Sequence, residues 1–112
     1  MVQEFKEVDA FMTAFREKAA SGEKFMVLFT GTIDEVTNAS WCPDCVVAKP
    51  HIARIIEASA GGRVLLKGVV SRDEWRGNTG HPYRAKPFGT EGVPTMALYE
   101  GTTQLYKVDE LD

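Results

Sequence analysis

Trp41-Cys42-Pro43-Asp44-Cys45 is the stretch from which the fold and chemistry of this chain are most directly inferred, because it holds the only two cysteines among 112 residues. Two cysteines spaced Cys-x-x-Cys can close into a short disulfide and reopen to thiols with little movement of the backbone. No third cysteine offers either of them a distant structural partner. The pattern therefore favours reversible thiol–disulfide chemistry over a structural cross-link.

The motif lies between a strand pattern and a helix pattern. Phe25–Phe29 is a short continuous apolar run, typical of a strand buried on both faces. From 43 to about 59 the apolar residues recur at helical spacing, and Val64–Val70 predicts a second buried strand. Cys42 is therefore expected at the start of a helix that follows a central strand, where α/β folds usually place an active site.

The N-terminal part predicts a helix with one apolar face. Asp9 is expected to cap this helix and Gly22 to end it. A first strand is expected within Gln3–Val8. The apolar positions of the helix are Phe11, Met12, Phe15 and Ala19.

The C-terminal part predicts an irregular segment and then a hairpin. Residues 71–92 are polar and rich in Gly, Pro and Arg, with a short helix expected near Asp73–Arg76. Thr95–Tyr99 and Thr103–Lys107 flank Glu100-Gly101-Thr102, a turn signal. Strands that alternate with helices, followed by a hairpin, predict one α/β domain over 1–112: a central mixed sheet flanked by helices.

Composition excludes several classes of partner. The formal net charge of -3 argues against nucleic acid and anionic membranes. No stretch approaches the roughly 20 apolar residues needed to span a bilayer. The N-terminal sequence lacks the pattern of a signal peptide. We therefore expect a cytoplasmic protein, in a compartment where a Cys-x-x-Cys pair is more often catalytic or metal-binding than structural.

The expected helix start assigns unequal roles to the two cysteines. Free backbone N–H groups and the helix dipole should stabilise a thiolate at Cys42, which we expect to attack a substrate disulfide. Cys45, about one turn further in, is expected to resolve the mixed disulfide. Pro43 suits the first helical turn. Asp44 is favourable near a helix N-terminus, but its charge opposes the thiolate.

Two alternatives involve no disulfide exchange. A zinc site needs about four ligands, and besides the cysteines only His51 and His81 are imidazoles. We expect both histidines at the surface or at helix caps, and no metal site. The second alternative is a pair of unreactive buried thiols, which the helix start disfavours.

The motif resembles the active site of thioredoxin-fold proteins, specifically the cytosolic thioredoxin-related subfamily marked by WCPDC. Pro50 matches the proline that kinks the active-site helix in thioredoxins, and Gly92-Val93-Pro94-Thr95 is similar to the segment that carries the cis-proline. Further similarity to WCPDC relatives lies in Glu74-Trp75-Arg76, His81-Pro82 and Arg84.

This resemblance implies a site and an activity. Pro94 should be cis and packed against the two sulfurs, and the backbone of Val93 should pair with an extended substrate. Trp41, Val93 and Thr95 are the implied substrate-binding residues. The implied activity is disulfide reduction with no bound cofactor, since the cysteines carry the electrons. The electron donor would be thioredoxin reductase or another thiol-based system, and the substrates cystine-like small molecules or selected proteins.

The chain departs from ordinary thioredoxins in several places, the first being Pro43-Asp44 where they have Gly-Pro between the cysteines. The strand Phe25–Thr30 holds no acidic residue, so we hypothesise that Asp44 assists proton transfer to Cys45. Lys67, in an apolar strand pattern, is expected at a strand end or reaching to water. The loop at 31–40 is longer and should restrict protein substrates. The usual C-terminal helix is short or missing. We therefore expect a sheet that is partly exposed, a sheet face covered by a second copy in a homodimer, or a shortened form of the protein.

Two other functions fit the motif. Cys-Pro-x-Cys also occurs in glutaredoxin-like proteins, which depend on glutathione and can use the first cysteine alone. A binding module whose partner affinity follows the redox state of Cys42 and Cys45 would need no catalytic turnover.

Overall fold

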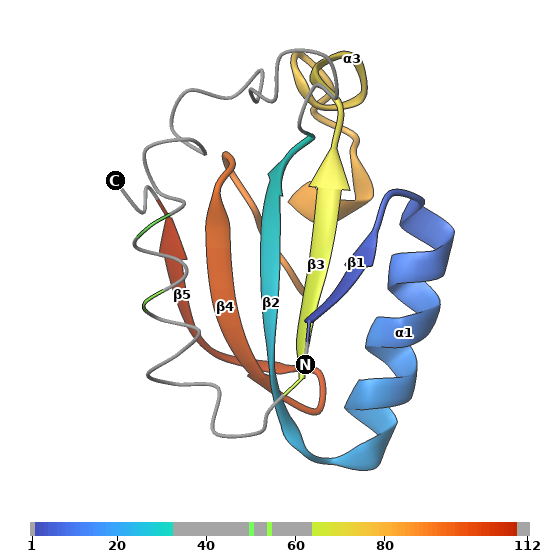
Figure 1. The fold of residues 1–112 in the computed structure, drawn as a ribbon, viewed down its shortest axis with the longest axis vertical. Coiled ribbons are helices and arrows are strands. Elements are labelled where there is room, and N and C mark those ends of the chain that lie inside the picture. The colour runs from blue at the N-terminus through green and yellow to red at the C-terminus, as the bar shows by residue number, and fades with distance from the viewer. Residues whose placement is uncertain (1, 33–49, 51–53, 55–63, 110–112) are drawn as a thin grey trace.

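The computed structural model describes residues 2–32, 50, 54 and 64–109. Five strands form one sheet in the order β1-β3-β2-β4-β5 (Figure 1). The elements are β1 Val2–Phe5, α1 Val8–Ser21, β2 Lys24–Gly31, β3 Leu65–Val70, α3 Arg72–Trp75, a 3-10 turn Pro82–Arg84, β4 Thr95–Glu100 and β5 Thr103–Asp109.

The sheet is mixed, as the sequence predicts. β3 runs parallel to both β1 and β2, whereas β4 runs antiparallel to β2 and β5 antiparallel to β4. The hairpin between β4 and β5 is confirmed, and Gly101 in its turn has φ +61°. That left-handed conformation is one that glycine adopts without steric cost.

Helix α1 starts two residues earlier than expected. Its N-cap is Glu7, with extended backbone (φ -98°, ψ 131°), so the expectation that Asp9 caps it is wrong. Asp9 instead lies in the first turn, where a negative charge suits the helix dipole. Gly22 ends the helix as predicted, with φ +75°.

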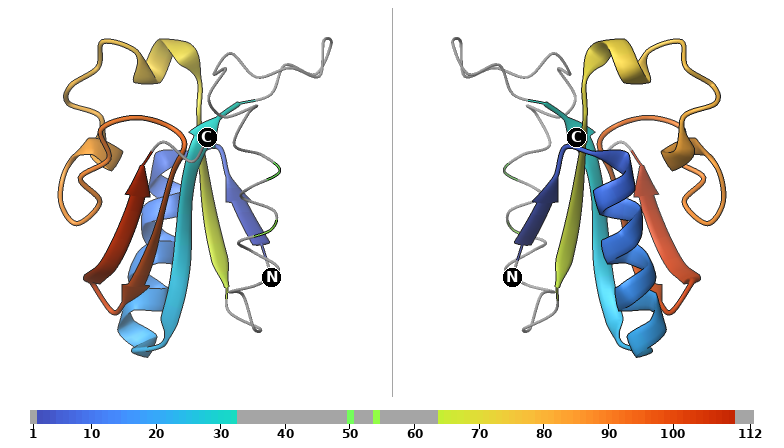
Figure 2. Two further views of the ribbon diagram at one scale, coloured as in Figure 1. Left: turned by 90° about the vertical axis from the view of Figure 1, so that its left-hand side faces the viewer. Right: turned by 90° about the vertical axis from the view of Figure 1, so that its right-hand side faces the viewer.

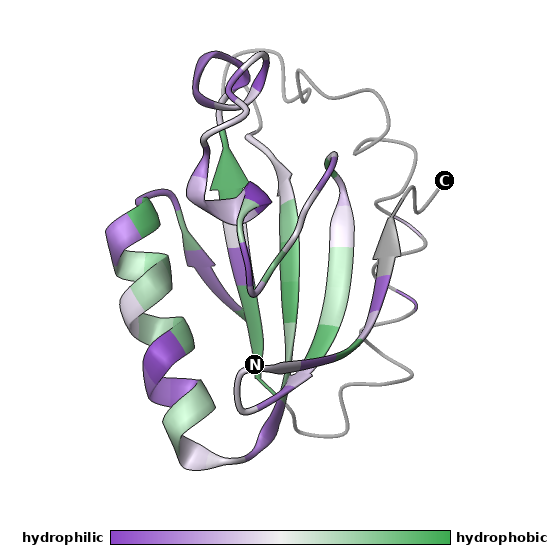
Figure 3. Ribbon diagram, turned by 180° about the vertical axis from the view of Figure 1, so that it is seen from behind, coloured by the Kyte–Doolittle hydropathy of each residue, from purple (hydrophilic) through white to green (hydrophobic). Residues whose placement is uncertain are grey.

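One face of the sheet carries an aromatic core beneath α1. Phe11 is fully buried, and its ring contacts those of Phe5, Phe29, Tyr83 and others. α1 and the segment 71–92 lie on this same face (Figure 2). Hydrophobic residues concentrate on the inner strands, while the described part of β5 is more polar (Figure 3).

The opposite face of the inner strands is also buried. Its apolar residues, each at most 9% exposed, are Met26, Leu28, Leu65, Met96 and Leu98. The inner strands β2, β3 and β4 are therefore buried on both faces. Among the described residues, the large apolar side chains that are exposed lie on edge strands: Val2 on β1, and Leu105 and Tyr106 on β5.

Lys67 lies inside β3 and not at a strand end. Its Cα is in register with that of Glu4 on β1, and its Nζ lies 3.2 Å from the Glu4 Oε1. An ion pair across two neighbouring strands, rather than water alone, thus accommodates this charge in an apolar strand. None of the helices among the described residues is long and apolar enough to cross a membrane.

Candidate functional site

The Cys-x-x-Cys motif lies outside the described residues. Trp41, Cys42, Pro43, Asp44 and Cys45 therefore remain sequence predictions, together with the 31–40 loop beyond Thr32. Within the predicted helix at 43–59, Pro50 and Arg54 are described, and both are helical and exposed. What the structure defines is the edge of the sheet from which the motif segment departs.

This edge is formed by the ends of three strands. β2 and β3 are parallel, so Gly31 and Val70 lie together at their carboxyl ends. The backbone N–H of Thr32 donates to the Val70 carbonyl (2.9 Å), which continues the pairing past the strand. β4 runs the opposite way and begins here, with Thr95 in register with Phe29. Pro94, directly before Thr95, therefore lies at the edge where β2 ends.

The Val93-Pro94 peptide bond is cis, as the family resemblance implies. Pro94 is buried and Val93 is half-buried against the aromatic core. Thr95 is 1% exposed, and its hydroxyl donates to the Gly92 carbonyl (2.6 Å). Any contact of Thr95 with a substrate would thus be made by its backbone. A second cis bond, Lys86-Pro87, has no signal in the sequence that would reveal it.

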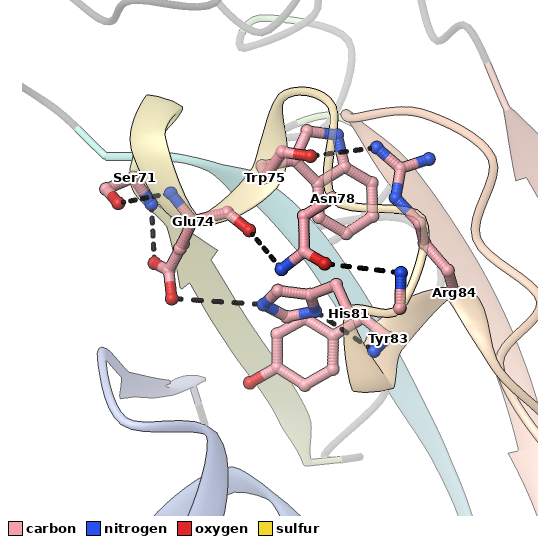
Figure 4. Close-up of polar contacts among 8 residues, drawn as sticks. Ser71, Glu74, Trp75, Asn78, His81, Tyr83 and Arg84 are labelled. Carbon is pink, nitrogen blue, oxygen red and sulfur yellow. Dashed lines mark hydrogen bonds and ion pairs between the residues drawn. The ribbon is translucent and has the colours of Figure 1, made fainter.

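A capping box starts α3 directly after β3. The Ser71 hydroxyl accepts from the Glu74 N–H (3.2 Å), and the Glu74 Oε1 accepts from the Ser71 N–H (2.6 Å). The spacing Ser-x-x-Glu is a readable sequence signal for this arrangement. The reciprocal bonds fix both the helix start and the direction of the Glu74 carboxylate (Figure 4).

His81 is a buried cap. Its Nδ1 accepts from the Tyr83 N–H (3.1 Å), which confirms the capping alternative for His81. The side chain is buried, at 3% exposure. Nδ1 as acceptor leaves the proton on Nε2. The Nε2 lies 3.8 Å from the Glu74 Oε2, too far for a hydrogen bond, and has no hydrogen-bond partner among the described residues.

Burial lowers the pKa of His81 below its usual 6.5, although the Glu74 carboxylate acts to raise it. The positive charge of Arg84 also lowers this pKa. The imidazole is therefore neutral at pH 7.

Arg84 connects α3 to the segment before the cis-proline. Its guanidinium carbon lies 3.9 Å from the centre of the Trp75 ring. Its Nη2 donates to the Trp75 carbonyl (3.1 Å), and its Nη1 donates to the Glu91 carbonyl (2.8 Å). Figure 4 shows the guanidinium beside the indole ring. In the sequence, Arg84 stands out only as part of the family resemblance. Nothing in its local pattern indicates hydrogen bonds to Trp75, nine residues earlier in the chain, and to Glu91, seven residues later.

Tyr83 anchors the same segment in the core. Its ring stacks on Phe29 of β2, with centroids 4.3 Å apart. Burial raises the pKa of its phenol. Gly68 of β3 makes room for both rings, because a Cβ there would lie 3.0 Å from the Phe29 ring and 3.2 Å from the Tyr83 ring. The stacking therefore depends on glycine at position 68.

The hairpin ties down the loop that contains the second cis-proline. The Tyr99 hydroxyl donates to the Pro87 carbonyl (3.1 Å), and the Gln104 Nε2 donates to the Phe88 carbonyl (3.1 Å). Burial raises the pKa of Tyr99, so its hydroxyl stays protonated and can donate. Among the described residues, no three His, Cys, Asp or Glu side chains gather in a way that could hold a metal ion.

Comparison with known proteins relates this architecture to a family of thioredoxin domains. The chain is 41% identical over 87 residues to thioredoxin-like protein Clot of Oryza sativa subsp. japonica, covering 72% of this chain and 62% of the rice protein. It is 38% identical over 78 residues to an acireductone dioxygenase of Leishmania infantum, covering 64% of this chain but 23% of that protein. The chain thus spans less than two thirds of either relative.

Solved structures share the fold at low sequence identity. The thioredoxin NaTrxh of Nicotiana alata superposes with a TM-score of 0.65 at 18% identity, over 99% of this chain and 82% of that one. The family model for the thioredoxin domain of thioredoxin domain-containing protein 17-like proteins matches residues 1–111. The chain therefore belongs to the family of thioredoxin domain-containing protein 17-like thioredoxin domains, with a thioredoxin-like α/β fold.

Proposed function

We propose that this protein is a thiol–disulfide oxidoreductase in which Cys42 is the nucleophile and Cys45 the resolving thiol. The observation that carries the proposal is the pairing of Phe29 with Thr95, which brings Pro94 to the edge of the sheet where β2 ends. The chain runs from that edge into the Cys-x-x-Cys motif. Membership of a thioredoxin family supports the same chemistry.

The reaction consists of two thiol–disulfide exchanges. The Cys42 thiolate attacks one sulfur of a substrate disulfide, forming a mixed disulfide and expelling the other substrate sulfur as a thiolate that takes up a proton. Cys45 then loses its proton and attacks the Cys42 sulfur. The second substrate thiol leaves, and Cys42 and Cys45 are joined in a disulfide. The substrate has gained two electrons and two protons, and a thiol-based donor must return them to the protein.

Two features of the motif should tune this chemistry. A cysteine at a helix start has a lowered pKa, because backbone N–H groups and the helix dipole favour the thiolate. Asp44 opposes that effect by its charge, and we propose that it accepts the proton of Cys45. If Asp44→Asn leaves the pH dependence of disulfide reduction unchanged, this role of Asp44 is excluded.

The proposed substrates are cystine-like small disulfides and selected protein disulfides, in the cytoplasm. The proposed donor is thioredoxin reductase or another thiol-based reductant. Pro43-Asp44 stands between the two cysteines, where ordinary thioredoxins have Gly-Pro. This difference gives the chain its resemblance to WCPDC proteins, and that resemblance supports both the proposed substrates and the proposed donor.

Reduction of cystine and of insulin by the wild type, Cys42→Ser and Cys45→Ser, with each candidate donor, tests the proposal. We expect turnover by the wild type and none by either variant. Glutathione-dependent turnover that survives Cys45→Ser would indicate a glutaredoxin-like enzyme instead. A reduced–oxidised cycle that changes partner affinity without any turnover would indicate a redox-regulated binding module.

A further inference from the structure

We propose that His81 is a pH switch: when it takes up a proton from solvent, it releases the 3-10 turn Pro82–Arg84 and slows disulfide exchange. The inference rests on the proposed function and adds regulation by pH to it. Neutral His81 caps this turn, and the turn holds the chain that leads to Pro94 at the edge of the sheet where β2 ends.

The two nitrogens of His81 have different surroundings. Nδ1 accepts from the Tyr83 N–H at 3.1 Å, so the proton of the neutral ring is on Nε2. Nε2 lies 3.8 Å from the Glu74 Oε2, and within the described part of the chain it has no hydrogen-bond partner. Figure 4 shows the imidazole between the Glu74 carboxylate and the backbone of Tyr83. The ring is therefore bonded on one side only, and a carboxylate lies on the other.

A second proton changes which side of the ring is bonded. It is added to Nδ1, because Nε2 already carries one. Nδ1 then becomes a donor that faces the Tyr83 N–H, which is also a donor, so this hydrogen bond is lost. The imidazolium is attracted to Glu74, and a small approach over the present 3.8 Å would make a charge-assisted hydrogen bond. Protonation thus exchanges the cap of the turn for an ion pair with α3.

The groups around the ring determine the pH at which this exchange takes place. Burial lowers the pKa of His81 most strongly, Glu74 of α3 raises this pKa, and Arg84 of the turn lowers it. The rings of Trp75 and Tyr83 cover the imidazole, with centroids 5.2 and 4.8 Å from its own. Burial raises the pKa of the Tyr83 phenol, so this group stays neutral. The exchange therefore occurs below pH 6.5, the ordinary pKa of histidine.

The turn holds the chain before Pro94 by two hydrogen bonds. The Tyr83 carbonyl accepts from the Thr90 N–H (3.1 Å), and the Arg84 Nη1 donates to the Glu91 carbonyl (2.8 Å). The next three residues lead to Pro94, at the edge of the sheet from which the motif segment departs. Loss of the cap therefore loosens the chain at this edge.

The pH sets the populations of two arrangements of the protein. In the neutral arrangement the turn is capped and the chain before Pro94 is held. In the protonated arrangement this chain is held less firmly, and exchange is slower because the reacting groups are oriented less precisely. The effect adds to the ordinary fall in rate that follows when thiolates become protonated. It applies to peptide and small disulfides alike, since the change lies in the protein.

Nuclear magnetic resonance of the wild type tests the exchange of bonds directly. The nitrogen resonances of His81 should show a proton on Nε2 alone at pH 7.5 and on both nitrogens after acidification. Protection of the Tyr83 amide from hydrogen exchange should then fall about fivefold more than that of the Met26 amide, the effect of one lost hydrogen bond. Met26 bonds to the Val64 carbonyl at the other end of the sheet and reports the stability of the whole fold. A proton on Nδ1 at pH 7.5, or equal losses at both amides, would overturn the proposal.

His81→Asn separates the switch from the chemistry of the thiols. Asparagine can still accept from the Tyr83 N–H but takes up no proton. The titration of Cys42 is common to both proteins, so the ratio of variant to wild-type turnover of cystine or insulin isolates position 81. This ratio should rise by about twofold between pH 7.5 and the pH at which half of His81 is protonated, because half of the wild-type molecules have then lost the cap. A ratio that is constant with pH would overturn the proposal.

Glu74→Gln is a second variant that leaves position 81 intact, and Asp73→Asn is its matched control. The amide oxygen of glutamine can still accept from the Ser71 N–H, but the charge that raises the pKa of His81 is removed. Protonation of His81, loss of Tyr83 protection and the fall in turnover should all shift to lower pH. Asp73 is exposed on the same helix, so its replacement repeats the chemical change but keeps the Glu74 charge. No shift in Glu74→Gln, or an equal shift in Asp73→Asn, would overturn the proposal.

Failure of the proposed function would have a different outcome. A wild type that reduces neither cystine nor insulin at pH 7.5 would contradict disulfide exchange itself. The resonance and hydrogen-exchange measurements need no turnover, so they would still decide whether His81 releases the turn. Turnover at pH 7.5 together with a constant ratio of variant to wild type would overturn the switch alone. Circular dichroism at each pH checks that the variants are folded.

Discussion

Phe29 of β2 and Thr95 of β4 are register partners in the antiparallel pair at the centre of the sheet. Because β2 approaches this edge and β4 leaves it, the residues that follow Phe29 and those that precede Thr95 lie side by side. Val93-Pro94 thus comes next to the chain that leads into the Cys-x-x-Cys motif. This arrangement links the described structure to the proposed chemistry, and the predictions below test the parts that maintain it.

Gly68→Ala should destabilise the fold by about 1–3 kcal/mol, the usual cost of overpacking a core. The new Cβ would lie 3.0 Å from the Phe29 ring and 3.2 Å from the Tyr83 ring, which stack on each other. Urea unfolding followed by circular dichroism measures the change. Gly80→Ala is the control, because the nearest atom to its Cβ is 3.7 Å away, and its effect should stay within about 0.5 kcal/mol. Similar values for the two variants would contradict the close approach at Gly68.

His81 should make the fold less stable as the pH falls below about 6.5, the ordinary pKa of histidine. Burial lowers its pKa in the folded state, so in this range the unfolded chain binds a proton that the folded chain does not. The free energy of unfolding therefore rises with pH through this window and is reduced on acidification.

His81→Asn removes this titration, while an amide oxygen can still accept from the Tyr83 N–H. Urea unfolding at pH 7.5 and pH 5 should show a smaller loss of stability in the variant than in the wild type. Because His51 is present in both proteins, the difference isolates His81. Equal losses in both proteins would show that the His81 pKa is not lowered.

Ser71→Ala should cost about 0.5–2 kcal/mol, since the hydroxyl caps α3 and its loss leaves the Glu74 N–H without that partner. Thermal unfolding provides the measurement. Thr13→Ala is a suitable control, because its hydroxyl bonds to the Asp9 carbonyl on the exposed side of α1 and should be near neutral. If Ser71→Ala were as mild as Thr13→Ala, the capping box would contribute nothing.

The sequence predicts the parts of the fold that depend on local pattern. The apolar run at 25–29 and that at 64–70 are the buried strands β2 and β3, and Gly22 ends α1 as expected. The turn at Gly101 joins β4 and β5. In each case the periodicity of apolar residues or the conformational freedom of glycine is a property of the segment itself.

The sequence does not predict what depends on contacts between distant segments. His81 is buried because Trp75 and Tyr83 pack on its ring, and Lys67 is accommodated because Glu4 is its neighbour across the strands. The cysteine motif itself remains a sequence prediction, supported by the cis bond before Pro94.

Trapping of a mixed disulfide tests the central claim most directly. The Cys45→Ser variant, reduced and then mixed with cystine, should accumulate a covalent adduct on Cys42 that intact-mass and peptide mass spectrometry detect, because no resolving thiol remains to release it. Cys42→Ser should accumulate far less adduct, and the wild type should instead form the Cys42–Cys45 disulfide. Adduct formation at Cys45 as fast as at Cys42, or none at Cys42, would contradict the assignment of Cys42 as nucleophile.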